Sequence, residues 1–142
     1  MPYLRNYNIF ISHAWKYGDE YKRLVDILNN ANYFSYKNYS APEEHPLKNL
    51  DGSPVQTKQE VMDAIDRKIK NSQIVLVISG MYANNREWMQ YEIDTAVRMG
   101  KPIIAVKPWG NTRTPKYVEN MADETVGWNT DSVVRAIRNY SI

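Results

Sequence analysis

The chain has 142 residues, of which 43% are hydrophobic and 24% are charged, as in a soluble globular protein with one core. Its net charge of +2 supplies no strong basic field, so we expect no nucleic-acid partner. The absence of cysteine excludes disulfides, thiolate nucleophiles and cysteine-ligated metals.

The first elements alternate between strand and helix. Tyr7–Ser12 is a short apolar run with β-favouring residues, and it predicts a strand. From Asp19 to about Asn32, apolar residues recur at spacings of three and four, which predicts an amphipathic helix. Tyr33–Tyr39 is a second strand candidate whose poor alternation suits the edge of a sheet. Residues 40–54 are rich in proline and predict a long loop, a kind that is more often functional than idle.

The second helix has two possible starts. Ser53 and Thr57 are each followed three residues later by a Gln or Glu, so either can form a capping box. Its buried stripe is predicted to be Val61, Ile65 and Ile69. Gln73–Ser79 then carries the clearest strand, since a run dominated by β-branched residues is typical of a strand covered on both faces.

The rest of the chain repeats this alternation. A third helix, with Asn84 and Glu87 as its cap, is expected to end at Gly100-Lys101-Pro102. Its predicted apolar face consists of Met89, Ile93, Ala96 and Val97. The later elements are a strand at Pro102–Pro108, a short helix from Pro115 to Met121, a strand at Glu124–Trp128 and a final helix, TDSVVRAIRNY.

Five strand–helix pairs predict an α/β fold with a parallel sheet covered by helices on both faces. The crossovers are expected to be right-handed. The favoured arrangement is a flavodoxin-like three-layer sandwich with five parallel strands in the order 2-1-3-4-5. We expect a single domain that spans residues 1–142.

A site is expected where the strand order reverses, beyond the carboxyl ends of the first and third strands. The segments that would line it are Ser12–Gly18, residues 40–54 and Ser79–Trp88. Trp88 and Glu92 are four residues apart and share one helix face, off the apolar face, so Glu92 would point toward a ligand. Its position near a helix N-terminus is expected to keep Glu92 ionised at neutral pH.

The substrate-binding candidates share that placement. Backbone amides around Ser12 could hold a phosphate, and aromatic rings could stack on a planar group. The full set is Phe10, Ser12, His13, Trp15, Ser79 and Trp88. Structural roles stay open: Ser12 could merely satisfy backbone groups, and Trp88 could simply pack. The two histidines lie far apart in sequence, so no metal site is expected.

Several function classes lack their motifs. There is no nucleophile elbow, no Walker-type phosphate loop and no Gly-x-Gly-x-x-Gly fingerprint, which argues against serine hydrolases, ATPases and dehydrogenases. A phospho-receiver would need acidic residues where the chain has Ile11-Ser12 and Ile78-Ser79. Residues 1–7 lack the apolar core of a signal peptide, and Ile74–Ile78 is too short to cross a bilayer. We therefore expect a cytoplasmic protein without membrane contact.

Two segments resemble motifs of TIR domains. FISHAWKYGDEY is similar to their first box, and REWMQYEI is similar to their third-strand helix motif, in which a Trp precedes a Glu by four residues. KPIIAVKP fits the fourth strand of that fold, while Met89 stands where many TIR domains have cysteine. The Pro-rich APEEHPL resembles the bacterial and archaeal TIR-like branch, which includes the sensor of Thoeris anti-phage systems.

The resemblance implies an enzyme that cleaves NAD at the nicotinamide–ribose bond, with Glu92 as its catalytic residue. NAD would be a substrate, so no cofactor is expected, and an ADP-ribose-derived product, cyclic in some relatives, would reach a separate effector. One carboxylate suits this reaction, because nicotinamide leaves as a neutral group that needs no general acid. Other TIR domains only assemble with one another, so a non-catalytic module that forms homo-oligomers is the alternative.

Overall fold

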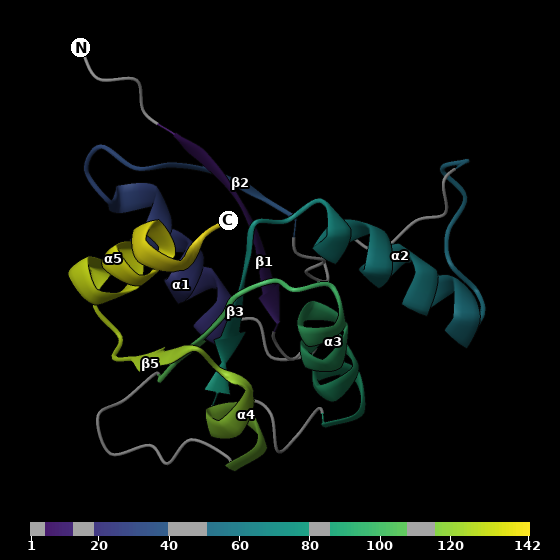
Figure 1. Ribbon diagram of the computed structural model, residues 1–142. Coiled ribbons are helices and arrows are strands. Elements are labelled where there is room, and N and C mark those ends of the chain that lie inside the picture. Colours follow the sequence, from purple (N-terminus) through teal and green to yellow (C-terminus); the bar gives the residue numbers. More distant parts are fainter. Residues whose placement is uncertain (1–4, 13–18, 40–50, 80–85, 108–115) are drawn as a thin grey trace.

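The computed structural model describes residues 5–12, 19–39, 51–79, 86–107 and 116–142 (Figure 1). Within these residues strands and helices alternate along the chain. They are β1 (Asn6–Ser12), α1 (Asp19–Asn30), β2 (Ser35–Asn38), α2 (Lys58–Lys70), β3 (Ile74–Ile78), α3 (Arg86–Arg98), β4 (Ile103–Val106), α4 (Lys116–Met121), β5 (Glu124–Val126) and α5 (Thr130–Tyr140).

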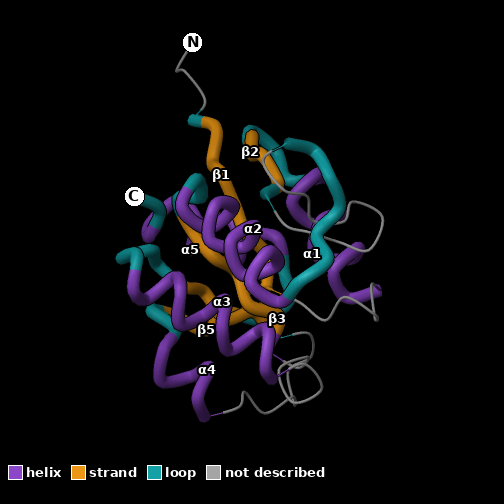
Figure 2. Tube along the Cα trace, turned by 90° about the vertical axis from the view of Figure 1, so that its right-hand side faces the viewer, coloured by secondary structure: helices purple, strands orange, loops and turns teal. Residues whose placement is uncertain are grey.

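The strands form one parallel sheet in the order β2-β1-β3-β4-β5. This confirms the predicted α/β fold and strand order. Helices α1 and α5 contact each other on one face, while α3 contacts α2 and α4 on the other (Figure 1). Figure 2 looks onto the second face and shows α2 and α3 in front of the strands. The layers follow from burial, because the central strand β3 is buried along its whole length and needs cover on both sides.

The sheet register places three strand ends at one edge. Ser12 at the end of β1 pairs with Val77 of β3, and Ile78 at the end of β3 pairs with Val106 of β4. In parallel strands these carboxyl ends meet on the same side of the sheet. We call this side the carboxyl edge, and it is where the sequence predicted a site.

Helix α2 begins at the later of its two predicted starts. The Thr57 hydroxyl accepts a hydrogen bond from the Glu60 N–H at 3.0 Å, and the Glu60 carboxylate accepts one from the Gln56 N–H at 3.1 Å. Ser53 instead donates its N–H to the Asp51 carboxylate at 2.9 Å, next to Gly52, whose φ of 87° suits glycine. Ser53 therefore belongs to a turn, and Thr57 caps the helix.

The predicted apolar face of α3 is partly wrong. Met89, Ile93 and Ala96 are fully buried, but Val97 is 51% exposed. Each residue turns the helix by about 100°, and the buried arc is centred on Glu92 and Ala96 rather than on Ile93. Val97 lies beyond that arc, whereas Glu92, expected off the apolar face, lies within it.

The described ranges contain neither a membrane-spanning helix nor a metal-binding cluster. No helix there is long and apolar enough to cross a membrane. No group of three or more His, Asp or Glu side chains gathers there in an arrangement that could hold a metal ion.

Candidate active site

Glu92 and Ser12 form a buried pair at the carboxyl edge. Glu92 is 2% exposed and Ser12 is fully buried. The Ser12 hydroxyl donates a hydrogen bond to Glu92 Oε1 at 2.7 Å, which joins the end of β1 to the second turn of α3. Two residues that the sequence analysis selected separately, 80 positions apart, are thus in direct contact.

Burial decides the protonation of this pair. Loss of hydration raises the pKa of the Glu92 carboxyl group to about 8, and the hydrogen bond from Ser12 opposes that rise only in part. The expectation that Glu92 is ionised at neutral pH is therefore wrong for the ligand-free domain. The favourable field of a helix N-terminus fades within the first turn, and Glu92 lies a turn deeper.

Ser79 and Phe10 have structural partners at or near this edge. The Ser79 hydroxyl is fully buried and donates to the Val106 carbonyl at 3.2 Å, which ties the end of β3 to β4. Phe10 is 1% exposed and belongs to the hydrophobic core. Both side chains therefore serve the sheet and its core, and a direct contact with substrate stays a prediction for each.

Trp88 lies on the same helix as Glu92, one turn earlier. Its ring is partly buried against the core and meets the ring of Tyr91 edge-on, with centroids 6.3 Å apart. Stacking of Trp88 on a ligand stays a prediction. His13 and Trp15 lie outside the described residues. So does most of each of the three segments expected to line the crevice, namely residues 13–18, 40–50 and 80–85.

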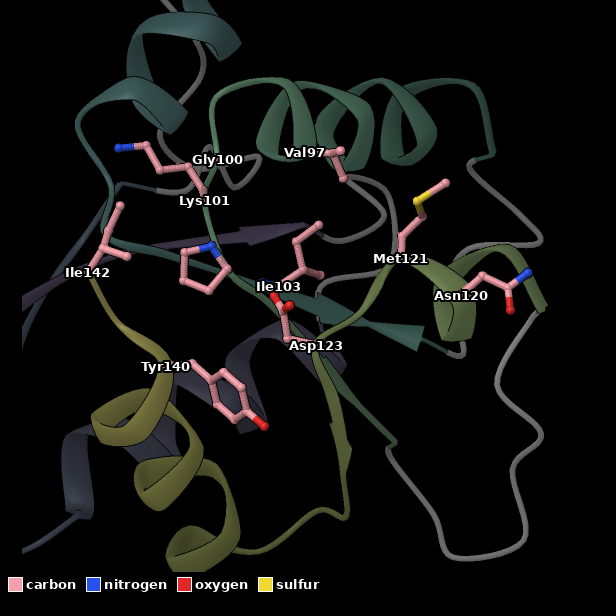
Figure 3. Close-up of a pocket in the computed structure, with 10 residues that line it drawn as sticks. Val97, Gly100, Lys101, Ile103, Asn120, Met121, Asp123, Tyr140 and Ile142 are labelled. Carbon is pink, nitrogen blue, oxygen red and sulfur yellow. Dashed lines mark hydrogen bonds between the residues drawn. The ribbon is translucent and has the colours of Figure 1, made fainter.

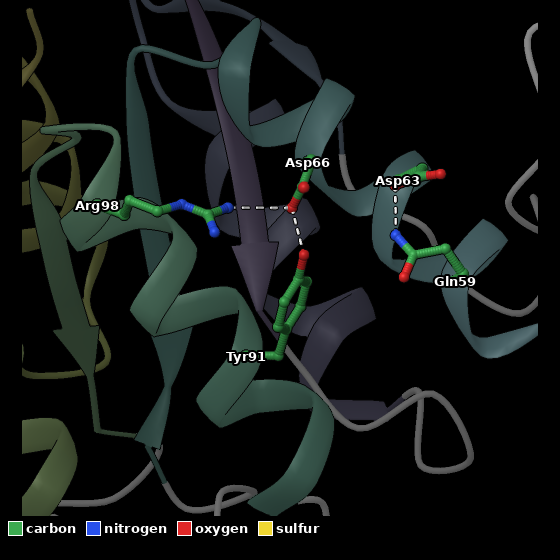
Figure 4. Close-up of polar contacts among 5 residues, drawn as sticks. All are labelled: Gln59, Asp63, Asp66, Tyr91 and Arg98. Atoms are coloured by element: carbon green, nitrogen blue, oxygen red, sulfur yellow. Dashed lines mark hydrogen bonds and ion pairs between the residues drawn. The ribbon is translucent and has the colours of Figure 1, made fainter.

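Tyr91, which the sequence analysis did not select for the site, fastens α3 to α2 (Figure 4). Its hydroxyl donates to Asp66 Oδ1 at 2.6 Å, and Arg98 Nη2 lies 3.5 Å from the same oxygen. Burial and the bond to Asp66 raise the pKa of the Tyr91 hydroxyl. No sequence spacing predicts this cluster, because its members come from two helices that meet only in the folded chain.

The contact between Tyr91 and Asp66 predicts a loss of stability, and a second aspartate on α2 provides the control. Asp66→Ala should lower the free energy of unfolding by about 1–2 kcal/mol, because it removes the charged acceptor of a partly buried hydroxyl. Asp63→Ala removes only an exposed bond from Gln59 on the same helix and should change it by less than about 0.5 kcal/mol. Urea denaturation measures both, and equal losses would contradict a special role for Asp66.

A hollow lies at the opposite edge of the sheet (Figure 3). It has a volume of about 420 Å³ and is lined in part by Ile103, which begins β4. The Asp123 carboxylate within it accepts the Ile103 N–H at 2.8 Å, so this acid serves the sheet. Four of its lining residues are large exposed hydrophobics: Val97, Met121, Tyr140 and Ile142. The hollow is separate from the Ser12–Glu92 pair.

Comparisons with known proteins agree with this fold. A conserved protein from Enterococcus faecalis superposes with a TM-score of 0.67 at 11% identity, covering 95% of this chain and 99% of that one. A CMP N-glycosidase from Clostridium botulinum superposes with a TM-score of 0.54 at 14% identity, covering 94% and 99%. At such identities the likeness shows the fold alone. No curated protein is significantly similar in sequence.

A family model, in contrast, matches the sequence itself. The model of the TIR-like domain of the Thoeris protein ThsB matches residues 10–113, well over half of the chain. The matched range contains Ser12 and Glu92 and most of the sheet, from β1 to β4. The chain therefore belongs to the family of Thoeris ThsB TIR-like domains.

Proposed function

We propose that the domain cleaves NAD at the nicotinamide–ribose bond and releases an ADP-ribose-derived nucleotide that signals in anti-phage defence. The observation that carries the proposal is the buried Glu92 carboxyl group, held by Ser12 at the carboxyl edge. Family membership supports it. The structural neighbour named as a CMP N-glycosidase gives support of a weaker kind, since its name describes cleavage of an N-glycosidic bond in a nucleotide on the same fold.

The proposed reaction requires one negatively charged side chain near the sugar and no general acid. When the bond from the ribose carbon to the ring nitrogen breaks, its electron pair goes to nicotinamide, which leaves neutral. The sugar is left as an oxocarbenium ion, and a nearby carboxylate stabilises that positive charge. Water or a hydroxyl of the same nucleotide then adds to the sugar carbon and loses a proton, which gives a hydrolysed or a cyclic product.

The substrate itself can ionise Glu92. The bound nicotinamide ring is a cation, and a positive charge within a few ångströms favours the charged form of a carboxyl group. Glu92, whose pKa is about 8 without ligand, would then release its proton on binding NAD. The acid is thus neutral while the site is empty and charged when the substrate needs it.

A non-catalytic assembly module is the second candidate. It is favoured by the four exposed apolar side chains that gather around the hollow at the opposite edge (Figure 3). Such a module would form homo-oligomers and act on an effector by contact, and Glu92 would then serve only the fold.

Nucleotide profiling distinguishes the two candidates. Purified protein and cells expressing it, with and without phage challenge, would be analysed by mass spectrometry for NAD, free nicotinamide and ADP-ribose derivatives. We expect nicotinamide to appear in step with NAD loss, in the challenged cells at least. Profiles identical to those of cells without the protein, under challenge as well, would remove the enzymatic proposal.

A further inference from the structure

Glu20, in the first turn of α1, has a carboxylate oxygen without a partner. Its Oε2 is buried from solvent and makes no hydrogen bond. A buried acceptor left unpaired costs stability, on the order of 1–3 kcal/mol, and charged groups cost more. Glu20 plays no part in the chemistry described above, so the cost of its unpaired oxygen needs another explanation.

The helix turns this side chain toward the sheet. Residues four apart share a helix face, and the two that continue the stripe from Glu20, Leu24 and Leu28, are fully buried. Glu20 is therefore the polar end of the inward stripe of α1. Asp26, on the same helix, is exposed and lies off this stripe.

That end of α1 lies at the carboxyl edge. The helix follows β1, which ends at Ser12, and it lies on the face of the sheet opposite to α3 (Figure 1). The carboxyl end of β1 thus has a glutamate on each side, the partly buried Glu20 from α1 and the fully buried Glu92 from α3. Burial raises the pKa of Glu20, and the nearby Arg23 guanidinium opposes that rise, so the group is partly dehydrated but not neutralised by a close ion pair.

We propose that Glu20 is a substrate-binding residue whose free carboxylate oxygen accepts a hydrogen bond from a ribose hydroxyl of the nucleotide. The inference rests on the proposed function and deepens it. A carboxylate can only accept, so its partner must present an O–H or N–H, and sugar hydroxyls are the donors closest to the bond that breaks. Glu20 would hold the sugar on the α1 side while Glu92 stabilises its charge from the α3 side.

This role and a structural role predict opposite effects on stability. Removing an oxygen that has no partner in the free protein should leave the melting temperature unchanged or raise it, while the nucleotide loses a contact. A residue that serves the fold would instead lower the melting temperature when replaced and leave the affinity of folded protein intact.

The test measures NAD affinity by calorimetry in Glu92→Gln protein, in which NAD is expected to be consumed about 10²–10³-fold more slowly. Adding Glu20→Met should weaken binding by about 10- to 100-fold, the value of one hydrogen bond to a charged group. Glu20→Gln should weaken it less, because its amide oxygen can still accept a hydrogen bond but carries no charge. Asp26→Asn, which removes a charge from the same helix, should change it less than about twofold. NAD analogues lacking one ribose hydroxyl should locate the contact, since the right analogue loses affinity only while Glu20 is present.

The possible outcomes distinguish a failure of the Glu20 inference from a failure of the proposed function. Unchanged affinity in both Glu20 variants, with parent protein that binds NAD, overturns the role of Glu20 and leaves the proposed function standing. A lowered melting temperature with unchanged affinity overturns it in favour of a structural role. If neither wild type nor Glu92→Gln protein binds NAD, the proposed function fails, and the inference falls with it.

Discussion

Replacing Glu92 with glutamine is expected to lower kcat for NAD cleavage by about 10²–10³-fold while the protein stays folded. The substitution removes the negative charge that stabilises the sugar cation, and the loss of one such preorganised contact costs about 3–4 kcal/mol of transition-state stabilisation. The amide oxygen of glutamine can still accept the bond from Ser12, so the pair that fixes α3 to β1 survives. Steady-state assays of nicotinamide release, with circular dichroism of the same samples, measure both effects.

Glu119→Gln is the matched control for this experiment. Glu119 lies in the first turn of α4 and is exposed, so its replacement makes the same chemical change without touching the carboxyl edge. We expect kcat within about twofold of wild type for this variant. Full activity in Glu92→Gln protein would show that the buried carboxyl group serves the fold alone, and the second candidate function would then be preferred.

The second large effect is on stability as a function of pH. Glu92 has a pKa of about 8 in the folded domain and an ordinary value of 4.5 in the unfolded chain. Between these values the folded state binds more protons than the unfolded state. Its contribution is therefore fully present below about pH 4.5 and is lost as the pH rises through 8. The corresponding fall in unfolding free energy is on the order of 5 kcal/mol.

Thermal melts from pH 5 to pH 9 test this prediction. The melting temperature of the wild type should fall steadily across that range, and Glu92→Gln protein, which cannot ionise there, should show a much flatter profile. The variant should also be more stable than the wild type at pH 9, where the wild type must bury a charged carboxylate. Parallel profiles for the two proteins would place the pKa of Glu92 near its ordinary value and refute the burial argument.

Local pattern was sufficient for the α/β class. The nearly continuous β-branched run of β3 and the apolar spacing of α1 predict their elements by rules that act over a few residues. Right-handed crossovers allow more than one strand order, so the order 2-1-3-4-5 was an expectation that the sheet confirms. The sequence pattern did not decide between the two possible starts of α2. Ser53 and Thr57 carry the same capping chemistry, and the folded chain has Thr57 as the cap and Ser53 in a turn with Asp51.

The candidate site divides in the same way. Sequence spacing and strand topology were enough to place Ser12 and Glu92 at one edge of the sheet, because both residues follow from the order of strands and the pitch of a helix. Neither the 2.7 Å contact nor the link from Tyr91 to Asp66 could be predicted, since each joins elements whose rotation is set by packing. The unpaired carboxylate oxygen of Glu20 could not be predicted from the sequence either.

The sequence by itself thus determined the α/β class and the carboxyl edge as the place where polar chemistry collects, because these depend on the alternation of strands and helices in a parallel sheet. Only the tertiary structure decided that Glu92 is buried and neutral when the site is empty. The physical reason is that ionisation depends on how much water the surrounding elements exclude, and that exclusion exists only once α3 is packed against β1.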